Sequence, residues 1–327
     1  MSLKGKVILL TGGTGSFGQK FTEIVLAEHD PKAIRIFSRG EFLQMEMARR
    51  FDTDPRLRFF IGDVRDKERL QLAMRGADIV VHAAALKQVP ACEYNPIEAV
   101  KTNINGAANV IDAAIGAAVP KVAFISTDKA VHPVNLYGST KLVAEKLFVQ
   151  ANSYTQGKLH FSCVRYGNVV GSRGSVIPLF LEQQNNGAVT ITDKAMTRFL
   201  ITLDQGVRFV MGSIEKMVGG EVFVPKIPSM RLLDIVEAVA PHAKLRVIGI
   251  RPGEKLHEVL ITPEESRRTI EFDNYYVIEP EHPFWNAESH QGGKRVGPDF
   301  YYGSDVNTHW LTPEELRKSL SEMQIEV

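Results

Sequence analysis

The chain has 327 residues, of which 44% are hydrophobic and 24% are charged, and its formal net charge is +1. These values are typical of a folded water-soluble protein, and the near-neutral charge excludes a bulk electrostatic attraction to nucleic acid or to an anionic membrane. No apolar run approaches the ~20 residues that span a bilayer, and the first residues lack the apolar region of a signal peptide. Cys92 and Cys163 lie in apolar surroundings, where buried free thiols are expected. We therefore expect a cytoplasmic protein.

The first half of the chain alternates short apolar runs with helical stretches. Runs such as Val7–Leu10 show no polar alternation, which is typical of strands that are covered on both faces. Strands are expected at residues 7–10, 34–37, 58–61, 78–82, 122–126 and 161–165, and helices at 16–27, 41–50, from 66 onward, at 96–118 and around Tyr137 and Lys141. This alternation predicts an α/β fold with a Rossmann-like, doubly wound parallel sheet.

The alternation breaks after Gly167. We expect helices at residues 177–184 and 232–240, short strands at 189–192, 221–224 and 245–249, and an irregular tail after 279. The strand at 221–224 is expected to return to the main sheet. We therefore predict a Rossmann domain over residues 1–168, to which about 198–228 returns, and a smaller, interleaved second domain, which would bind the substrate, mainly over 169–327.

A glycine-rich loop connects the first expected strand to the first expected helix. Gly13, Gly15 and Gly18 match the pattern G-x-G-x-x-G, and Gly12 extends it to the wider G-x-x-G-x-x-G. Such glycines allow a tight turn and bring backbone N–H groups close to a pyrophosphate at the start of the helix. A glycine turn without a ligand is the alternative, but the position of the loop favours dinucleotide binding. The residues expected to hold the dinucleotide here are Gly12, Thr14, Gly15, Ser16, Phe17 and Gly18.

Two further positions bear on which dinucleotide binds. The second expected strand ends at Ser38 and Arg39, where chains that bind NAD usually carry an acidic residue for the ribose 2′-hydroxyl. A hydroxyl and a guanidinium suit a 2′-phosphate instead, so we expect NADP, although Glu41 lies close. Asp63, followed by Val64, is expected to accept from the adenine amino group; the alternative is that Asp63 caps the next helix.

The residues with the clearest chemistry follow the fifth expected strand. Thr127, Asp128 and Lys129 stand at the carboxyl edge of the sheet, where open α/β sheets bind ligands. Tyr137 and Lys141 are four residues apart and share one face of the next helix, so the ammonium can lower the pKa of the phenol. Hydride transfer needs one such acid–base pair. A chain that carries two is expected to eliminate a group as well, unless Asp128 and Lys129 form only a surface ion pair.

These residues resemble those of the extended short-chain dehydrogenase/reductase superfamily and, within it, the inverting UDP-N-acetylglucosamine 4,6-dehydratases of the pseudaminic-acid pathway. The matching stretches are residues 11–18, 37–39, 59–66, 83–90, 93–96, 101–106, 126–130, 135–142, 165–176, 196–200, 221–229 and 249–259. Retaining sugar dehydratases carry Thr-Asp-Glu where this chain has Thr127, Asp128 and Lys129, and C4-epimerases carry small or hydroxyl residues. Lys129 is therefore the residue that distinguishes the inverting group.

The resemblance implies a division of roles in the catalytic block. Tyr137 would take the proton of the C4 hydroxyl while NADP takes the C4 hydride. Lys129 would remove the C5 proton in its uncharged form, with its pKa lowered by burial or by Lys141. Asp128, protonated, would donate to the departing C6 hydroxyl. The hydride would then return to C6, and reprotonation of C5 from the opposite face would invert that centre.

The resemblance also implies how the UDP-sugar is held. Lys87, which follows Ala83 in the cofactor site, is expected near both cofactor and sugar, and Asn168 near the sugar. Cations for the diphosphate are Arg173, Arg198 and Arg251, and Glu254 would accept from a ribose hydroxyl. No metal site is expected, and a homo-oligomer, either dimer or hexamer, is expected. Two alternatives remain: a UDP-sugar C4-epimerase, and a non-catalytic NADP-sensing module that binds a protein partner.

Overall fold

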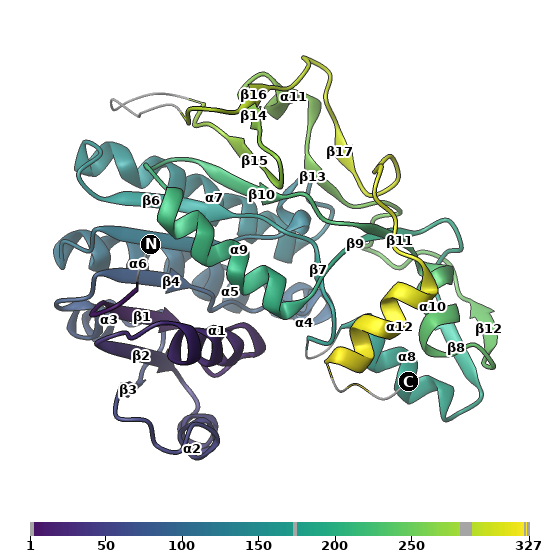
Figure 1. Ribbon diagram of the computed structural model, residues 1–327, viewed down its shortest axis with the longest axis horizontal. Helices are drawn as coiled ribbons and strands as arrows, with labels where there is room; N and C mark the ends of the chain where they lie inside the picture. The colour runs from purple at the N-terminus through teal and green to yellow at the C-terminus, as the bar shows by residue number, and fades with distance from the viewer. Residues whose placement is uncertain (1–2, 173–174, 282–289, 324, 326–327) are drawn as a thin grey trace.

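The apolar runs of the first half form the centre of one large sheet. The computed structural model describes residues 3–172, 175–281, 290–323 and 325. The parallel strands follow the order β3-β2-β1-β4-β5-β6-β10, which contains the 3-2-1-4-5-6 order of a doubly wound Rossmann sheet (Figure 1). Their bounds are β1 Val7–Thr11, β2 Ala33–Ser38, β3 Leu57–Ile61, β4 Ile79–His82, β5 Lys121–Ile125, β6 His160–Val164 and β10 Val222–Pro225. The predicted fold class is confirmed, as is the return of residues 221–224 to this sheet.

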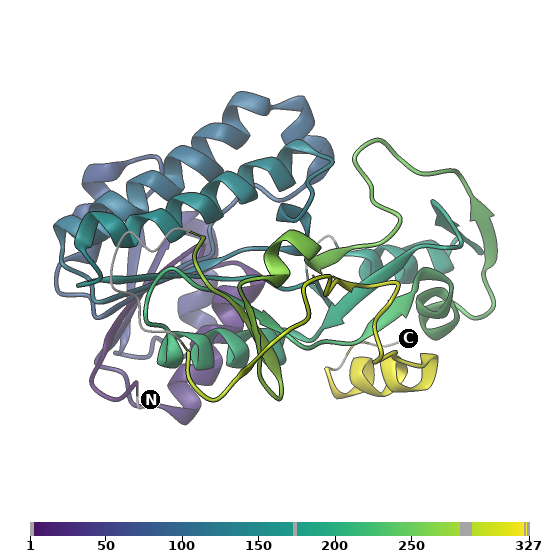
Figure 2. The ribbon, with the colours of Figure 1, turned by 90° about the horizontal axis from the view of Figure 1, so that it is seen from above.

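Helices cover both faces of the sheet, because its strands are apolar on both sides. One face carries α1 (Ser16–Glu28) and α9 (Leu203–Lys216), and the other carries α3 (Lys67–Met74), α6 (Gly106–Gly116) and α7 (Leu136–Thr155) (Figure 2). The helix α2 (Glu41–Arg50) lies beyond the edge strand β3 (Figure 1). The predicted helix at 41–50 has these bounds, and those predicted at 16–27 and from 66 onward agree to within about one residue.

The helix predicted at residues 96–118 is interrupted. It consists of α5 (Pro96–Ala99), a π-helical segment at Val100–Asn105 and α6, and the short helix α4 (Val89–Tyr94) precedes it. The wide turn contains Asn103, whose side chain accepts from Leu86 N at 2.8 Å and donates to Thr140 Oγ1 at 3.0 Å. A π-helical insertion of this kind often lies near a functional site. Here it fixes the loop after β4 against the helix that carries Tyr137.

A second group of elements packs beside the carboxyl edge of the main sheet. It comprises α8 (Val176–Gln184), α10 (Leu232–Val239), α12 (Pro313–Glu322), the pair β8 (Ala188–Ile191) and β12 (Lys244–Val247), and the three strands β7 (Asn168–Val169), β9 (Thr197–Ile201) and β11 (Ser229–Arg231) (Figure 1). These elements share their own apolar cluster, which includes Ile177, Phe180 and Leu316. The predicted helices at 177–184 and 232–240 and the strands at 189–192 and 245–249 are confirmed to within about two residues.

The tail of the chain is more regular than its sequence suggests. The strands β15 (Tyr275–Ile278), β14 (Thr269–Glu271) and β16 (Lys294–Arg295) extend the main sheet beyond β10 with antiparallel pairing. The strand β13 (Val259–Ile261) and the helix α11 (Pro263–Ser266) precede β14 in the chain, and β17 (Tyr302–Gly303), which pairs with β13, follows β16. Residues 222–295 therefore contribute strands to both the main sheet and the adjoining elements.

A buried ion-pair network joins these elements behind the carboxyl edge. Arg165, at the end of β6, is 1% exposed, and its guanidinium contacts Glu145 of α7 and Glu265 of α11, with Nη2 2.9 Å from Glu265 Oε1. Arg165 Nη1 also donates to Leu260 O at 2.8 Å, and Ser126 Oγ donates to Glu145 Oε2 at 2.7 Å. One cation therefore holds a buried carboxylate, Glu145, and a half-buried one, Glu265, and ties the helix of Tyr137 to the tail.

The two cysteines agree with what the sequence predicts, and the helices bear on whether the chain could cross a membrane. Cys92 and Cys163 are free and buried. Across the parts of the chain that the structure describes, none of the helices combines the length and the apolar character needed to cross a bilayer.

Candidate active site

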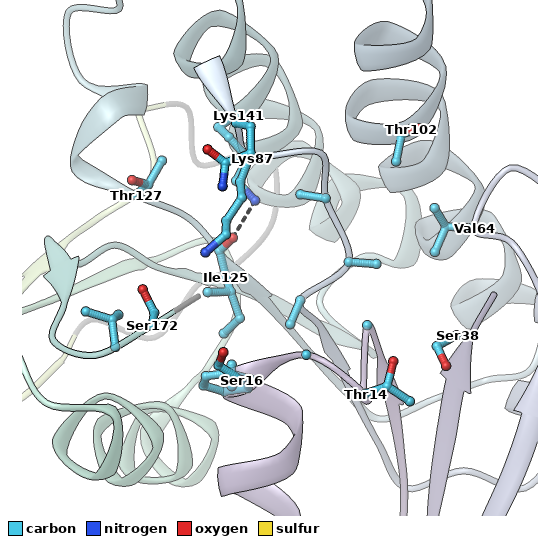
Figure 3. A pocket seen from close by; sticks show the side chains of 18 of the residues that line it. Thr14, Ser16, Ser38, Val64, Lys87, Thr102, Ile125, Thr127, Lys141 and Ser172 are labelled. Carbon is cyan, nitrogen blue, oxygen red and sulfur yellow. Dashed lines mark hydrogen bonds between the residues drawn. The ribbon is translucent and has the colours of Figure 1, made fainter. Parts of the chain in front are cut away.

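A cleft of about 810 Å³ opens at the carboxyl ends of the parallel strands. Figure 3 shows Lys87, Thr127 and Lys141 gathered on one side of it, across from Thr14 and Ser16 of the glycine-rich loop. Most of the predicted site residues line this one cleft: Gly12, Thr14, Gly15, Ser16, Phe17, Ser38, Arg39, Asp63, Val64, Ala83, Lys87, Thr127, Lys129, Tyr137, Lys141 and Asn168. The topology thus brings together residues at the carboxyl ends of the strands β1 to β6 with Tyr137 and Lys141 of α7.

The glycine-rich loop has the geometry of a phosphate cradle. Gly12 has φ +68°, and a Cβ there would lie 2.9 Å from the backbone of Ala84, so only glycine fits. A Cβ at Gly18 would lie 2.2 Å from Gly13 O, which shows how closely α1 packs on the loop. Gly15 caps α1 without a side-chain hydrogen bond, which leaves first-turn N–H groups available to an anion. The residues present therefore fit the pyrophosphate of a dinucleotide.

The end of β2 forms the second part of the cleft. Gln44 Nε2 donates to Ser38 Oγ at 3.0 Å, and the side chain of Arg39 is 58% exposed with Nη1 3.8 Å from Asp63 Oδ2. Asp63 does not cap the next helix, because Asp66 holds that position and accepts from Arg69 N at 2.9 Å. The guanidinium of Arg39 is thus presented to the cleft, where a phosphate can reach it.

The turn at residues 128–130 follows β5 and buries an acid. Asp128 is 0% exposed, and its Oδ1 accepts from Thr127 Oγ1 at 2.9 Å and from Lys129 Nζ at 3.0 Å. Within the described residues, Asp128 Oδ2 has no hydrogen-bond partner. Burial raises the pKa of the Asp128 carboxyl above its usual value. This direction agrees with the expectation that Asp128 can carry a proton.

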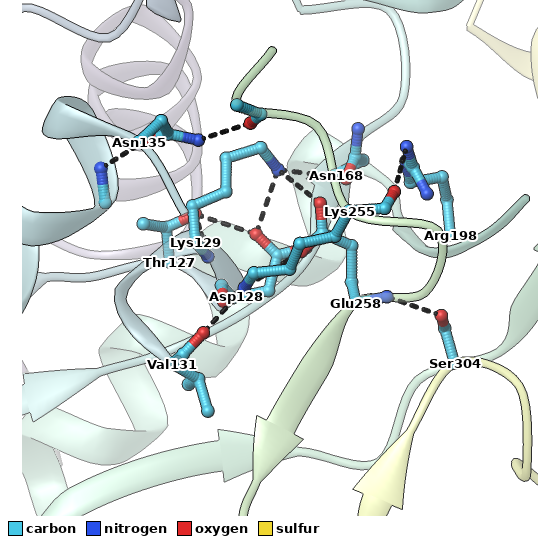
Figure 4. A network of polar contacts seen from close by, with 12 residues as sticks. Thr127, Asp128, Lys129, Val131, Asn135, Asn168, Arg198, Lys255, Glu258 and Ser304 are labelled. Atoms are coloured by element: carbon cyan, nitrogen blue, oxygen red, sulfur yellow. Dashed lines mark hydrogen bonds and ion pairs between the residues drawn. The ribbon is translucent and has the colours of Figure 1, made fainter. Parts of the chain in front are cut away.

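Lys129 lies between two carboxyls. Its Nζ lies 3.0 Å from Asp128 Oδ1 and 3.5 Å from Glu258 Oε1, and it donates to Asn168 Oδ1 at 3.5 Å (Figure 4). Burial lowers the pKa of Lys129, but the carboxyls of Asp128 and Glu258 outweigh burial and raise that pKa above its usual value. The expected lowering of the Lys129 pKa is therefore not found in this structure, because the two carboxyls favour the ammonium form.

Tyr137 and Lys141 lie one turn apart near the start of α7. Burial raises the pKa of Tyr137 to about 12, and Lys129, not Lys141, is the first cation that opposes this rise. Lys141 Nζ instead donates to Ile125 O at 2.5 Å and lies 3.9 Å from the centroid of the Phe124 ring. Burial lowers the pKa of Lys141 to about 7. The expected lowering of the Tyr137 pKa by Lys141 is therefore not found in this structure.

A close backbone contact fixes α7 against the turn at residues 128–130. Asn135 caps the helix by accepting from Gly138 N at 2.7 Å. A Cβ at Gly138 would lie 2.1 Å from Lys129 O, so the helix and the turn can approach this closely only because residue 138 has no side chain. This contact sets the distance between Tyr137 and the Asp128–Lys129 pair.

Replacing Gly138 by alanine is expected to lower the free energy of unfolding by about 1–3 kcal/mol, because the added methyl group must push α7 away from the turn. The urea midpoint measures this loss. Gly116→Ala is the matched control, since a Cβ at this α6 position would meet nothing within 4 Å. The control is expected to change stability by less than about 0.5 kcal/mol. Equal midpoints for the two variants would contradict the contact.

The residues predicted to bind the UDP-sugar are only partly brought together. Lys87 and Asn168 line the cleft, and burial lowers the pKa of Lys87. Arg198 is half-buried, and its guanidinium donates to the carbonyls of Thr197, Lys255 and Leu256. Arg251 is exposed in a turn that is closed by its N–H donating to Glu254 Oε2 at 3.3 Å. Arg173 lies outside the described residues.

Sequence reasoning missed Glu258 and Lys255. Glu258 is 3% exposed and faces Lys129, while Lys255 Nζ donates to Asp128 O at 3.2 Å and to Val131 O at 2.6 Å. Asn135 joins the same segment by donating to Gly253 O at 2.8 Å. The available signal was an acidic residue immediately before the apolar run Val259–Ile261, which is the start of a buried strand.

Known proteins are similar to this chain over nearly its whole length. The profile of a family described as polysaccharide biosynthesis protein matches residues 8–280. The UDP-N-acetylglucosamine 4,6-dehydratase (inverting) of Campylobacter jejuni is 51% identical over 95% of this chain and 96% of its own length. A UDP-glucose 4-epimerase of Rickettsia akari is 43% identical over 96% of this chain and 95% of its own. The solved structure of Pen from Bacillus thuringiensis, 40% identical, superposes with a TM-score of 0.91 and covers 100% of both chains.

Proposed function

This chain belongs to the polysaccharide biosynthesis protein family, and from that membership we propose that it is an inverting UDP-N-acetylglucosamine 4,6-dehydratase, a lyase. The observation that carries the proposal is the second acid–base pair. Asp128 is buried and pairs with Lys129, which lines the same cleft as Tyr137. Oxidation at C4 needs Tyr137 alone, whereas removal of water across C5 and C6 also needs a base and an acid. The product is a UDP-2-acetamido-2,6-dideoxy-4-hexulose.

The cofactor is a nicotinamide dinucleotide, and we propose NADP. Gly12, Thr14, Gly15, Ser16 and Phe17 would hold the pyrophosphate, while Ser38 and Arg39 would hold the 2′-phosphate beside Asp63 and Val64. Ala83 and the backbone of Tyr166 and Gly167 would lie along the nicotinamide. When bound, the nicotinamide would accept the C4 hydride and return it to C6, so the same cofactor serves every turnover.

Replacing Arg39 by alanine is expected to raise the Kd for NADP by about tenfold or more, because a charge-assisted hydrogen bond to the 2′-phosphate is lost. The Kd for NAD is expected to change by less than about twofold, since NAD lacks that phosphate. Titration calorimetry with each dinucleotide measures both values. Arg49→Ala, an exposed arginine on α2, is the control and is expected to leave both unchanged. Equal weakening of NAD and NADP binding by Arg39→Ala would contradict the assignment of NADP.

The ion pair supplies both reactive forms by one internal proton transfer. Moving a proton from Lys129 to Asp128 across their 3.0 Å hydrogen bond gives an uncharged amine and a carboxylic acid. Burial favours this uncharged pair, because it raises the pKa of Asp128 and lowers that of Lys129, whereas the attraction between the two charges favours the ion pair. The amine then removes the C5 proton, and the acid protonates the C6 hydroxyl, which departs as water. The pair is left again as ammonium and carboxylate, while Tyr137 holds the proton of the C4 hydroxyl.

A UDP-sugar C4-epimerase is the second candidate. Relatives named as UDP-glucose 4-epimerases are 43% identical or less, and an epimerase would use the same Tyr137 and Lys141. Mass spectrometry of the product distinguishes the two activities when the purified protein is given UDP-N-acetylglucosamine. A dehydratase gives a product lighter by one water, whereas an epimerase gives a product of unchanged mass. An unchanged mass would overturn the proposed elimination.

We also propose the setting of the reaction. The protein would act in the cytoplasm, on a route to pseudaminic acid or a related glycan, and as a homo-oligomer, either dimer or hexamer. Exposed apolar side chains on α4 and α5, such as Tyr94 at 88% and Ile97 at 63%, support association of copies. Light scattering of the purified protein measures the oligomeric state.

A further inference from the structure

The carboxylate of Glu258 occupies a position that its burial makes unfavourable. Glu258 immediately precedes β13 and is 3% exposed, and its Oε1 lies 3.5 Å from Lys129 Nζ. Its Oε2 lies 3.4 Å from Lys255 Nζ but forms no hydrogen bond with any described residue. Glu258 is thus a buried carboxylate that faces two lysine ammonium groups, one of which is Lys129.

The backbone around Glu258 holds this carboxylate in place. Glu258 N donates to Ser304 Oγ at 2.9 Å, and Ser304 N donates to Glu258 O at 2.8 Å. Lys255, three residues before Glu258, donates to the carbonyls of Asp128 and Val131. These hydrogen bonds hold the segment against the turn at residues 128–130. Figure 4 shows Lys129 and Lys255 converging on the carboxyls of Asp128 and Glu258. Glu258 is thus fixed relative to Lys129 from both sides.

Charges reach Lys129 from several elements. Asp128 lies on its own turn, Glu258 comes from the segment before β13, Arg198 from β9, and Tyr137 from α7, while Lys87 comes from the loop after β4. Among these groups, Glu258 is the only one outside the segment from Thr127 to Lys141 that favours protonation of both Asp128 and Lys129. Its negative charge raises the pKa of Asp128 and the pKa of Lys129. Lys129, Arg198 and Lys255 keep Glu258 itself ionised, because they outweigh its burial and lower its pKa.

We propose that Glu258 is a positioning residue for the Asp128–Lys129 pair: it aims the Lys129 amine at C5 and sets the pH range in which the pair holds its one shared proton. This inference rests on the proposed dehydratase function. Elimination needs Lys129 without its proton and Asp128 with one, so the two groups together must hold a single proton. The pair is therefore active only between the pH at which it loses its first proton and the pH at which it loses its second. Because Glu258 favours protonation of both groups, it moves this whole window to higher pH. No co-reactant is required, since the proton passes only between Lys129 and Asp128.

Removal of the Glu258 charge is expected to move both limbs of the pH profile. Glu258→Gln is expected to shift the bell-shaped dependence of C5 solvent exchange to lower pH by about one unit. Loss of the contact with Lys129 is expected to lower kcat by about 10²-fold, while KM for UDP-N-acetylglucosamine changes by less than about twofold, because Glu258 acts on the pair and not on the substrate. Glu258→Asp keeps the charge but shortens the side chain. It is expected to lower kcat while leaving the bell near its original pH.

The matched control is Glu264→Gln, which makes the same chemical change at a glutamate whose side chain is 76% exposed. It is expected to leave kcat and the pH profile unchanged. A bell that stays in place in Glu258→Gln would overturn the proposal whatever happens to kcat, and so would a bell displaced equally in Glu258→Asp. If Glu258→Gln does not fold, Glu258→Asp decides by itself: lowered kcat with an unmoved bell supports the role, and unchanged kcat overturns it. Absence of C5 exchange in the unaltered protein would overturn the dehydratase function, and the role of Glu258 with it.

Discussion

Replacing Lys129 by methionine is expected to slow solvent exchange at C5 of UDP-N-acetylglucosamine by about 10²–10⁴-fold, which is the contribution typical of a positioned general base. Methionine keeps the bulk of the lysine stem but cannot take a proton. Asp128 loses its cation and is expected to become protonated, because it is buried, whereas Glu258 keeps its contact with Lys255. Deuterium incorporation from labelled water, followed by proton NMR, measures the exchange rate. Circular dichroism shows whether the variant is folded.

The same variant distinguishes a dehydratase from an epimerase. An epimerase leaves C5 untouched and would keep its activity without Lys129. Lys146→Met is the matched control, because this lysine lies on α7 with its side chain 58% exposed and pairs only at the surface with Glu281. The control is expected to exchange C5 at the original rate. Unimpaired C5 exchange in folded Lys129→Met would contradict the role of Lys129 as the base.

Replacing Arg165 by methionine is expected to lower the free energy of unfolding by about 3–5 kcal/mol, the usual loss when one partner of a buried ion pair is removed. Arg165 is 1% exposed, and its loss leaves the buried Glu145 and the half-buried Glu265 without their cation. Glu265 is held ionised by Arg165, which with the local hydrogen bonds outweighs burial and lowers its pKa. The shift of the urea midpoint is the measurement. A midpoint can be compared between variants even where a chain of this size does not unfold in one step.

A surface ion pair provides the control for Arg165. Arg208 contacts Glu28 and Asp204, but its side chain is 48% exposed. Arg208→Met is therefore expected to change stability by only about 0–1 kcal/mol. A midpoint for Arg165→Met as high as that for Arg208→Met would show that the buried network does not hold the tail against the helix of Tyr137.

Local patterns predicted the Rossmann part of the fold well, because its strands are unbroken apolar runs and its crossovers follow one rule of handedness. The helix α9 was missed although Thr202 and Gln205 form a capping box at its start, and α12 was missed although Thr312 and Glu315 do the same. The strands β14 to β16 are two to four residues long. Strands that short carry too little periodicity to be recognised, and only long-range pairing stabilises them.

In the candidate site, too, local motifs were predicted well and contacts made by tertiary packing were not. The glycine-rich loop and the block from Thr127 to Lys141 were placed at the carboxyl edge by motif and strand order. The rise in the pKa of Lys129 was not predicted, because it depends on the carboxyls of both Asp128 and Glu258, and Glu258 reaches the site only through tertiary packing. The effect of Lys141 on Tyr137 was wrong for a related reason: Lys141 turns to Ile125 O and the ring of Phe124. Sequence spacing gives the face of a helix that two side chains share, but not the partners that each one finds.

The central claim is that the protein eliminates water from UDP-N-acetylglucosamine with inversion at C5. Proton NMR of the purified protein with this substrate in deuterated water, without added cofactor, tests it most directly. We expect a 4-keto-6-deoxy product that carries solvent deuterium at C5, with couplings of the inverted centre. Conversion to the galacto epimer without deuterium at C5 would contradict the claim and favour a C4-epimerase. No conversion, even after NADP is added, would contradict both activities.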